Sequence, residues 1–327
     1  MRLKATLLLL LGVFIPAQCT FANPAGQDAN KAQSSLVDKQ NSSESDESVT
    51  TIRSSVQEVN LIFTATDRKG HFKRDLKSND VQIVDDGKPP AAVRSFRSET
   101  DLPLRVGLVL DVSGSITDRF TFEQDSAIRF FNQMLRPGTD QAFVLAFDSV
   151  TALTQDFTDK PDKLAAGVKA LTPGGGSAVY DAVQYAAMKK LMNLHSERPM
   201  RKVIILISDG EDNQSRATRS DVIDAARRAE ATVYAISTNT ANTKSRGDKV
   251  LEHLAEETGG RVFFPNKLDD VIRAFNTIQD ELRSQYAMSY KPADLIADGH
   301  YRRIELHSPT DKNVILRARK GYFAPSN

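Results

Sequence analysis

The sequence predicts an α/β fold in which a doubly wound, mostly parallel sheet is inserted between N- and C-terminal β segments that form one β-sandwich. Apolar, strand-like runs alternate with helical patterns across residues 103–284, which is typical of a parallel sheet with helices on both faces. Apolar and polar residues alternate with period two in residues 52–100 and 285–324. Neither flank is long enough for a core of its own, so we expect the two to pair.

An export signal is predicted at residues 1–22. Arg2 and Lys4 precede an apolar run from Leu7 to Ile15, which is too short for a permanent membrane span. Two small-residue cleavage sites follow, and cleavage at either one removes Cys19, the single cysteine. We therefore expect an exported protein without disulfides or a stable transmembrane span, in the periplasm, on the cell surface or outside the cell. The alternative interpretation is an uncleaved membrane anchor.

A polar linker follows the signal. Residues 23–50 are rich in Ser, Gln, Asp and Asn, a composition that cannot bury apolar surface and predicts disorder. Over the whole chain, 43 Lys and Arg residues balance 42 Asp and Glu residues. No global charge therefore favours nucleic acid as a partner.

The N-terminal β segment is predicted from alternation and turn chemistry. Residues 59–66 alternate, residues 81–84 form a second short strand, and residues 92–96 form a further one. Asp86-Gly87 is typical of a hairpin turn. We expect about four strands in residues 52–98.

The central region is predicted to alternate strands and helices. Strands are expected at 104–110, 141–147, 150–157, 202–208, 232–238 and 261–264. Helices are expected at 119–135, 160–171, 178–194, 219–230, 249–258 and 267–284. In the C-terminal segment, strand patterns cover 286–290, 301–306 and 314–319.

Polar side chains follow two of the central strands. The strand at 104–110 runs into Asp111-Val112-Ser113-Gly114-Ser115, Asp209 follows the strand at 202–208, and Ser177 ends a glycine-rich loop. Open α/β sheets place their ligand sites at the carboxyl edge of the strands. Two carboxylates balance a divalent cation, and hydroxyls add oxygen ligands without charge. We therefore expect an open site for Mg²⁺ (or Mn²⁺ or Ca²⁺) held by Asp111, Ser113, Ser115, Ser177 and Asp209. Taken alone, the Asp-x-Ser-x-Ser stretch is equally consistent with a helix N-cap.

These residues resemble the metal-ion-dependent adhesion site (MIDAS) of von Willebrand factor A-type domains, also called integrin inserted-type domains, which have a Rossmann-like fold. That family usually has Thr where Ser177 stands, and the serine keeps the hydroxyl. Residues 52–324 are similar to a bacterial family of exported von Willebrand factor A-related proteins seen in Acidobacteria-type genomes. That similarity lies in the segments 66–70, 85–88, 283–286 and 319–322. The resemblance implies an adhesion-type module whose bound metal engages an acidic residue of a protein partner.

Catalytic motifs are not evident in the sequence. It contains no Gly-Lys-Ser/Thr phosphate loop and no Gly-x-Ser-x-Gly elbow, and its five histidines share no metal-ligand spacing. We therefore expect no enzyme activity, and a metal-dependent hydrolase is a remote alternative. The closer alternative is a structural or envelope-assembly scaffold in which the metal only stabilises the fold.

Two further patterns have competing interpretations. Arg246-Gly247-Asp248 spells an integrin-recognition tripeptide, which we interpret as coincidence in a polar loop. Glu211 and Asp212 follow the second predicted metal ligand. They belong either to a solvated loop or to a rim that shapes the cation site.

Overall fold

The computed structural model of the chain describes residues 58–99, 101–114, 120–194, 199–239, 241, 243–294 and 296–326. The predicted export signal, the linker and Ser115 lie outside these residues. Within the described part of the chain, no helix has the length and apolar character needed to cross a membrane.

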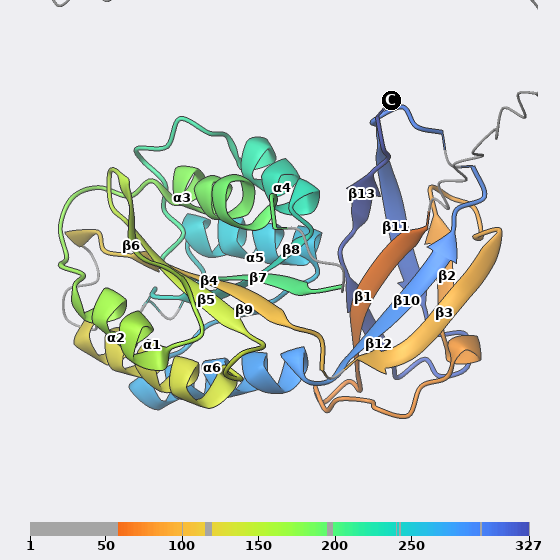
Figure 1. Cartoon of the computed structure of the whole chain (residues 1–327), viewed down its shortest axis with the longest axis horizontal. Helices are drawn as coiled ribbons and strands as arrows, with labels where there is room; N and C mark the ends of the chain where they lie inside the picture. The colour runs from red at the N-terminus through yellow and green to blue at the C-terminus, as the bar shows by residue number, and fades with distance from the viewer. Residues whose placement is uncertain are drawn as a thin grey trace, which may run out of the picture. The chain divides into compact units, whose positions relative to one another are not determined.

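The central sheet has six strands in the order β6-β5-β4-β7-β8-β9 (Figure 1). They are β4 (Leu104–Asp111), β5 (Gln141–Phe147), β6 (Thr151–Thr158), β7 (Arg201–Ser208), β8 (Ala231–Ser237) and β9 (Val262–Phe263). Neighbouring strands are parallel except β5 and β6, which are antiparallel. The predicted mostly parallel sheet is confirmed.

Helices cover both faces of this sheet, with α1, α2 and α6 on one face and α3, α4 and α5 on the other (Figure 1). Their bounds are α1 (Phe120–Met134), α2 (Pro161–Lys169), α3 (Val179–Tyr185), α4 (Arg219–Arg228), α5 (Arg246–Thr258) and α6 (Leu268–Leu282). A π-helical segment, η3 (Ala186–Leu191), continues α3 and completes the single helix predicted there.

An apolar core lies on each face of the sheet, where the strands pack against the helices. Leu108 shares one core with Phe130 and Phe275, whereas Phe143 and Leu206 belong to the other. Since both faces of the central strands are buried, these strands have continuous apolar runs rather than alternation. The polar residues that interrupt those runs therefore stand out at the strand ends.

Capping residues explain where α4 and α5 begin. Thr218 and Ser245 accept hydrogen bonds from the third amide of each helix, and the acids at those third positions, Asp221 and Asp248, complete two capping boxes. The sequence pattern placed the start of α5 at residue 249. The cap moves it three residues earlier, because Ser245 satisfies amides that apolar periodicity does not reveal.

The strands of the two terminal segments form antiparallel sheets together. One sheet has the order β12-β1-β10-β3 and the other β13-β11-β2. The bounds are β1 (Val59–Thr66), β2 (Gln82–Asp85), β3 (Ala92–Glu99), β10 (Gln285–Lys291), β11 (Tyr301–His307), β12 (Ile315–Ala318) and β13 (Gly321–Phe323), with a short 3-10 helix at Ser78–Asp80. The expected pairing of the N- and C-terminal segments is confirmed, while the exact domain limits stay a prediction.

The number of N-terminal strands differs from the prediction. Three strands, rather than about four, lie in the described part of residues 52–98. Asp86 and Gly87 do form a tight turn with φ of 49° and 80°. The strands on either side of this turn do not pair with each other, because β2 pairs with β11 and β3 with β10. Long-range partners therefore override the local hairpin signal.

Candidate cation site

Asp111 is the centre of the candidate site. It ends β4 and is 1% exposed. One carboxylate oxygen accepts the amide of Ser113 at 2.9 Å, and the other accepts the hydroxyls of Ser208 at 2.7 Å and Ser177 at 3.3 Å. Burial raises the pKa of the Asp111 carboxyl, hydrogen bonds from Ser113 and Ser208 oppose this, and the charge of Asp209 adds to it. The carboxylate is thus solvated by hydroxyls and an amide and faces a second negative charge.

Ser177 is fixed by the loops around it. Its amide donates to the Asn213 side chain at 3.0 Å, and its carbonyl accepts the Asn213 amide at 3.0 Å. The preceding loop is anchored to the residue that follows β4 by a hydrogen bond of 2.6 Å from the Gly174 amide to the Val112 carbonyl. At Gly175, φ is 80° and an added Cβ would lie 2.7 Å from an Asp148 carboxylate oxygen, so a side chain does not fit.

Asp209 follows β7, and its position depends on the loop behind it. One of its carboxylate oxygens accepts the amide of Glu211 at 3.0 Å. Gly210 has φ of 76° and lies against Gly247 in the first turn of α5. A Cβ at Gly247 would be 2.2 Å from the carbonyl oxygen of Asp209. The backbone of the second predicted ligand is therefore clamped by a glycine contact.

Glu211 and Asp212 hold this loop by binding helix N-termini. Glu211 accepts the Gly247 amide of α5 at 2.9 Å, and Asp212 accepts the Tyr180 amide of α3 at 3.0 Å. Acidic side chains at these positions also interact favourably with the helix dipoles. The two carboxylates thus position the backbone of the loop that carries Asp209. This role is intermediate between a solvated loop and a rim that shapes the cation site, the two interpretations that the sequence left open.

Asp248 of the Arg-Gly-Asp tripeptide is part of a helix cap. Its side chain lies in the first turn of α5, is 1% exposed and accepts hydrogen bonds from Ser237, Asn239 and Ser245. Such a carboxylate is already satisfied inside the protein. The interpretation of the tripeptide as coincidence therefore has a structural basis.

The structure brings Asp111, Ser113 and Ser177 together and places Asp209 close enough to influence Asp111 electrostatically. Ser208 also belongs to this group, although sequence reasoning did not select it. Its signal was a polar residue at the end of an apolar strand. Among the described residues, no three His, Cys, Asp or Glu side chains form a metal-binding group, and the predicted set instead relies on hydroxyls. Buried oxygen donors around two acids fit a hard divalent cation.

Comparison with known proteins identifies the family. The model of the von Willebrand factor type A domain matches residues 106–280, more than half of the chain. Comparison with the sequences of curated proteins gives no match.

Solved structures with similarity to this chain have low identity. The PilB minor pilin of Streptococcus sanguinis shows 15% identity and a TM-score of 0.46, over 56% of this chain and 62% of the pilin. Proximal thread matrix protein 1 from the mussel byssus, with a zinc-occupied MIDAS motif, shows 18% identity and a TM-score of 0.48, over 60% of this chain and 49% of that protein. The von Willebrand factor domain of the type V pili tip protein Mfa5 from Porphyromonas gingivalis shows 13% identity and a TM-score of 0.46. That match covers 56% of this chain and 95% of the Mfa5 domain.

The chain therefore spans less than two thirds of the length of the pilin and the mussel protein. The family match itself covers β4 to α6, which is the doubly wound sheet with its helices. On this basis, the chain belongs to the von Willebrand factor type A domain family.

Proposed function

We propose that this chain is an exported, non-enzymatic protein-binding module that uses a divalent cation to engage an acidic residue of a protein partner. The cation is Mg²⁺, or Mn²⁺ or Ca²⁺, and its ligands are Asp111, Ser113, Ser115, Ser177 and Asp209. One observation carries the proposal: the Asp111 carboxylate receives hydrogen bonds from serine hydroxyls and an amide, while burial, with the nearby charge of Asp209 adding to it, raises its pKa.

Charge balance explains why such a site would accept a partner. Asp111 and Asp209 together neutralise a divalent cation, and the serine hydroxyls add no charge. When bound, the cation supplies an electrophilic centre that an incoming carboxylate can complete. Ser208 donates to Asp111 and accepts the Gly210 amide at 2.9 Å, so it ties the two acidic loops together.

Direct cation binding is the first test. Isothermal titration of metal-free protein with MgCl₂ and MnCl₂ should give saturable binding that Asp111→Ala weakens by at least about a hundredfold, since a charged ligand is removed. Asp162→Ala, which removes an exposed acid on α2, is the matched control and should bind like wild type. Equal affinity in wild type and Asp111→Ala contradicts the proposal.

Partner binding is the second test. Affinity capture from a native cell envelope should retain a partner with wild type and Asp162→Ala, and lose it with Asp111→Ala or with chelator. Capture that survives both treatments, combined with normal cation binding, favours the scaffold function in which the metal only stabilises the fold.

A further inference from the structure

A basic cavity lies at the edge of the sheet opposite the candidate cation site. It has a volume of about 380 Å³ and is lined at the start of β7, on β8 and α4, and on β1, β10 and β12. Arg201 opens β7, and Asp209 follows its last residue. At about 3.3 Å per residue, Arg201 and Asp209 are about 26 Å apart along this strand. The cavity is therefore separate from the cation site.

Cations outnumber acids on the walls of this cavity. Its lining includes a single acid, Glu230, and six basic residues: Arg97, Arg201, Lys202, Arg227, Arg317 and Arg319. Four of the six have a carboxylate partner: Arg97 with Glu99, Arg227 with Glu257, Arg317 with Glu281, and Arg319 with Glu230 at 2.7 Å. Two positive charges, on Arg201 and Lys202, have no ion-pair partner within the described part of the chain.

Arg201 is a buried cation whose hydrogen bonds within the described part of the chain go to neutral backbone carbonyls. It is 3% exposed, and its guanidinium donates to the carbonyls of Leu282 and Glu99. Its Nε has no hydrogen-bond partner among the described residues. Burial lowers the pKa of Arg201 to about 10, the Glu99 carboxylate opposes this, and the charges of Arg283 and Arg136 lower it further.

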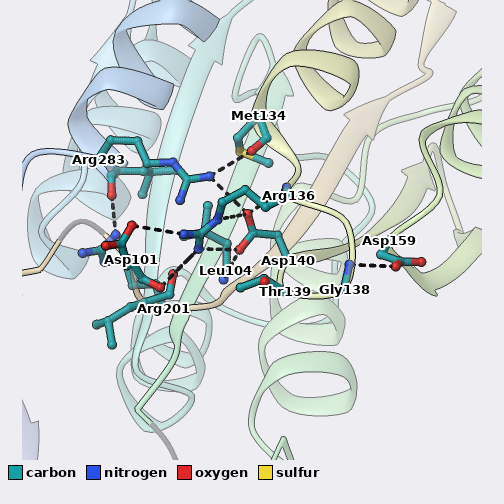
Figure 2. A network of polar contacts seen from close by, with 12 residues as sticks. Asp101, Leu104, Met134, Arg136, Gly138, Thr139, Asp140, Asp159, Arg201 and Arg283 are labelled. Atoms are coloured by element: carbon teal, nitrogen blue, oxygen red, sulfur yellow. Dashed lines mark hydrogen bonds and ion pairs between the residues drawn. The ribbon is translucent and has the colours of Figure 1, made fainter.

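The acids behind Arg201 pair with other arginines. Figure 2 shows Arg136 and Arg283 converging on the carboxylate of Asp140, with Arg201 beside them. That single buried carboxylate is already shared between two guanidinium groups. Arg136 also pairs with Asp101 at 3.4 Å, so the two arginines and two acids of this network balance one another and none of these acids pairs with Arg201.

Lys202 adds a flexible cation to the lining of the same cavity. It is partly buried, and burial lowers its pKa while the charge of Glu230 opposes this. Glu230 is itself bonded to Arg319. An ammonium group on a four-carbon stem can reorient toward an incoming anion without disturbing the strand.

We propose that this cavity binds a compact organic dianion, either a dicarboxylate or a phosphomonoester, with Lys202 and Arg201 as its charge partners. Two unpaired cations match two negative charges, and the volume lies at the small end of the range for ligand pockets, about 300–1,000 Å³. The remaining arginines already have carboxylate partners, so they restrict the shape of the ligand rather than its charge. The site lies beside residues of both the six-stranded sheet and the four-stranded sheet, so its ligand contacts both.

Thermal shift and titration calorimetry test this site directly. Metal-free full-length protein is titrated with succinate, glycerol 1-phosphate and inorganic phosphate, with acetate and NaCl at equal ionic strength as references. We expect at least one dianion to bind saturably and to raise the melting temperature more than either reference. Tighter binding of succinate or of glycerol 1-phosphate distinguishes a dicarboxylate from a phosphomonoester, and tighter binding of inorganic phosphate than of both contradicts an organic ligand.

Lys202→Met should weaken that binding about tenfold or more, since one charge-assisted hydrogen bond is lost. Lys163→Met, which removes an exposed charge on α2, should leave it unchanged. Because Lys202 has no ion-pair partner among the described residues, Lys202→Met should unfold in urea at no lower concentration than wild type. Equal responses to dianions and NaCl, or equal dianion affinity in wild type and Lys202→Met, overturn the proposal.

Discussion

Asp111 and Asp140 are both almost fully buried, at 1% and 0% exposure, yet their surroundings are opposite. Asp111 ends β4 at the carboxyl edge of the sheet, whereas Asp140 precedes β5 at the amino edge. Asp140 accepts hydrogen bonds from Arg136 and Arg283 and from the Leu104 amide (Figure 2). Asp111 has no described cationic partner and faces a second acid instead.

The pKa directions of the two carboxyls follow from this difference. Burial alone raises both, but hydrogen bonds from Arg136, two backbone amides and Arg283 bring the pKa of Asp140 below its usual value. At Asp111, burial and the charge of Asp209 prevail over the hydrogen bonds, and the pKa is raised. The chain supplies its own cations at one edge and leaves the charge at the other edge for a bound cation to balance.

Removing the paired acid should have the largest effect. Asp140→Ala leaves two arginines without their shared carboxylate and the Leu104 amide without its acceptor, at a cost of about 3 kcal/mol. In metal-free buffer, Asp111→Ala should cost much less, because it removes a desolvated charge without stranding a cation. Urea unfolding measures both. Similar losses for the two variants would remove the basis of the comparison.

Adding the cation should bring the losses at Asp111 and Asp140 close to each other. Mg²⁺ at 100 times its dissociation constant should stabilise wild type by about 2.7 kcal/mol, because it binds the folded state alone. Asp111→Asn should gain nothing, and Asp140→Asn should keep the full gain from its lower starting point. Chemical unfolding with and without Mg²⁺ decides this, and a gain that survives in Asp111→Asn places the cation elsewhere.

The glycine clamp behind Asp209 should link the fold to the site. In Gly247→Ala, the new Cβ meets the Asp209 carbonyl at 2.2 Å, which should cost about 2 kcal/mol and weaken cation binding several-fold by displacing that loop. Gly174→Ala is the matched control, since it lies in the Ser177 loop but its Cβ would meet no atom within 4 Å. Urea unfolding and calorimetric cation titration of both variants distinguish displacement of the Asp209 loop from the mere loss of a flexible glycine. Normal cation affinity in Gly247→Ala argues against the clamp.

The two edges also differ in how far the sequence could predict them. The sequence could predict four of the candidate cation ligands because each adjoins a recognisable strand or loop: Asp111, Ser113, Ser177 and Asp209. Ser208 was missed because its bond to Asp111 requires the parallel register of β4 and β7, which local pattern does not contain.

Contacts between residues that are far apart in the chain could not be predicted from the sequence. Arg283 and Asp140 are 143 positions apart, and nothing in either neighbourhood indicates the other. The three-residue strand β13 was likewise too short for a periodic signal, and its pairing with β11 positions it. The mostly parallel sheet followed from strand–helix alternation, whereas the ion pairs at its amino edge join residues that are far apart in the sequence.

The smallest predicted effect is a pair of opposite pH slopes. The folded pKa of Asp140 is lowered, so its stabilisation is present above the unfolded value of about 3.9 and is lost as pH falls through the folded pKa. The folded pKa of Asp111 is raised, so in metal-free buffer stability falls as pH rises from about 3.9 through the folded pKa. A tenfold difference in either acid dissociation constant between the folded and unfolded states corresponds to about 1.4 kcal/mol of stability.

Urea unfolding across the acid range, in metal-free buffer, resolves these slopes. Asp140→Asn should flatten the loss of stability toward acid, and Asp111→Asn should flatten the loss toward neutral pH. Mg²⁺ should abolish the second slope in wild type, because a bound cation keeps the Asp111 carboxylate charged in the folded state. If both variants change the same limb of the pH curve, the two buried aspartates do not differ in the way their partners imply.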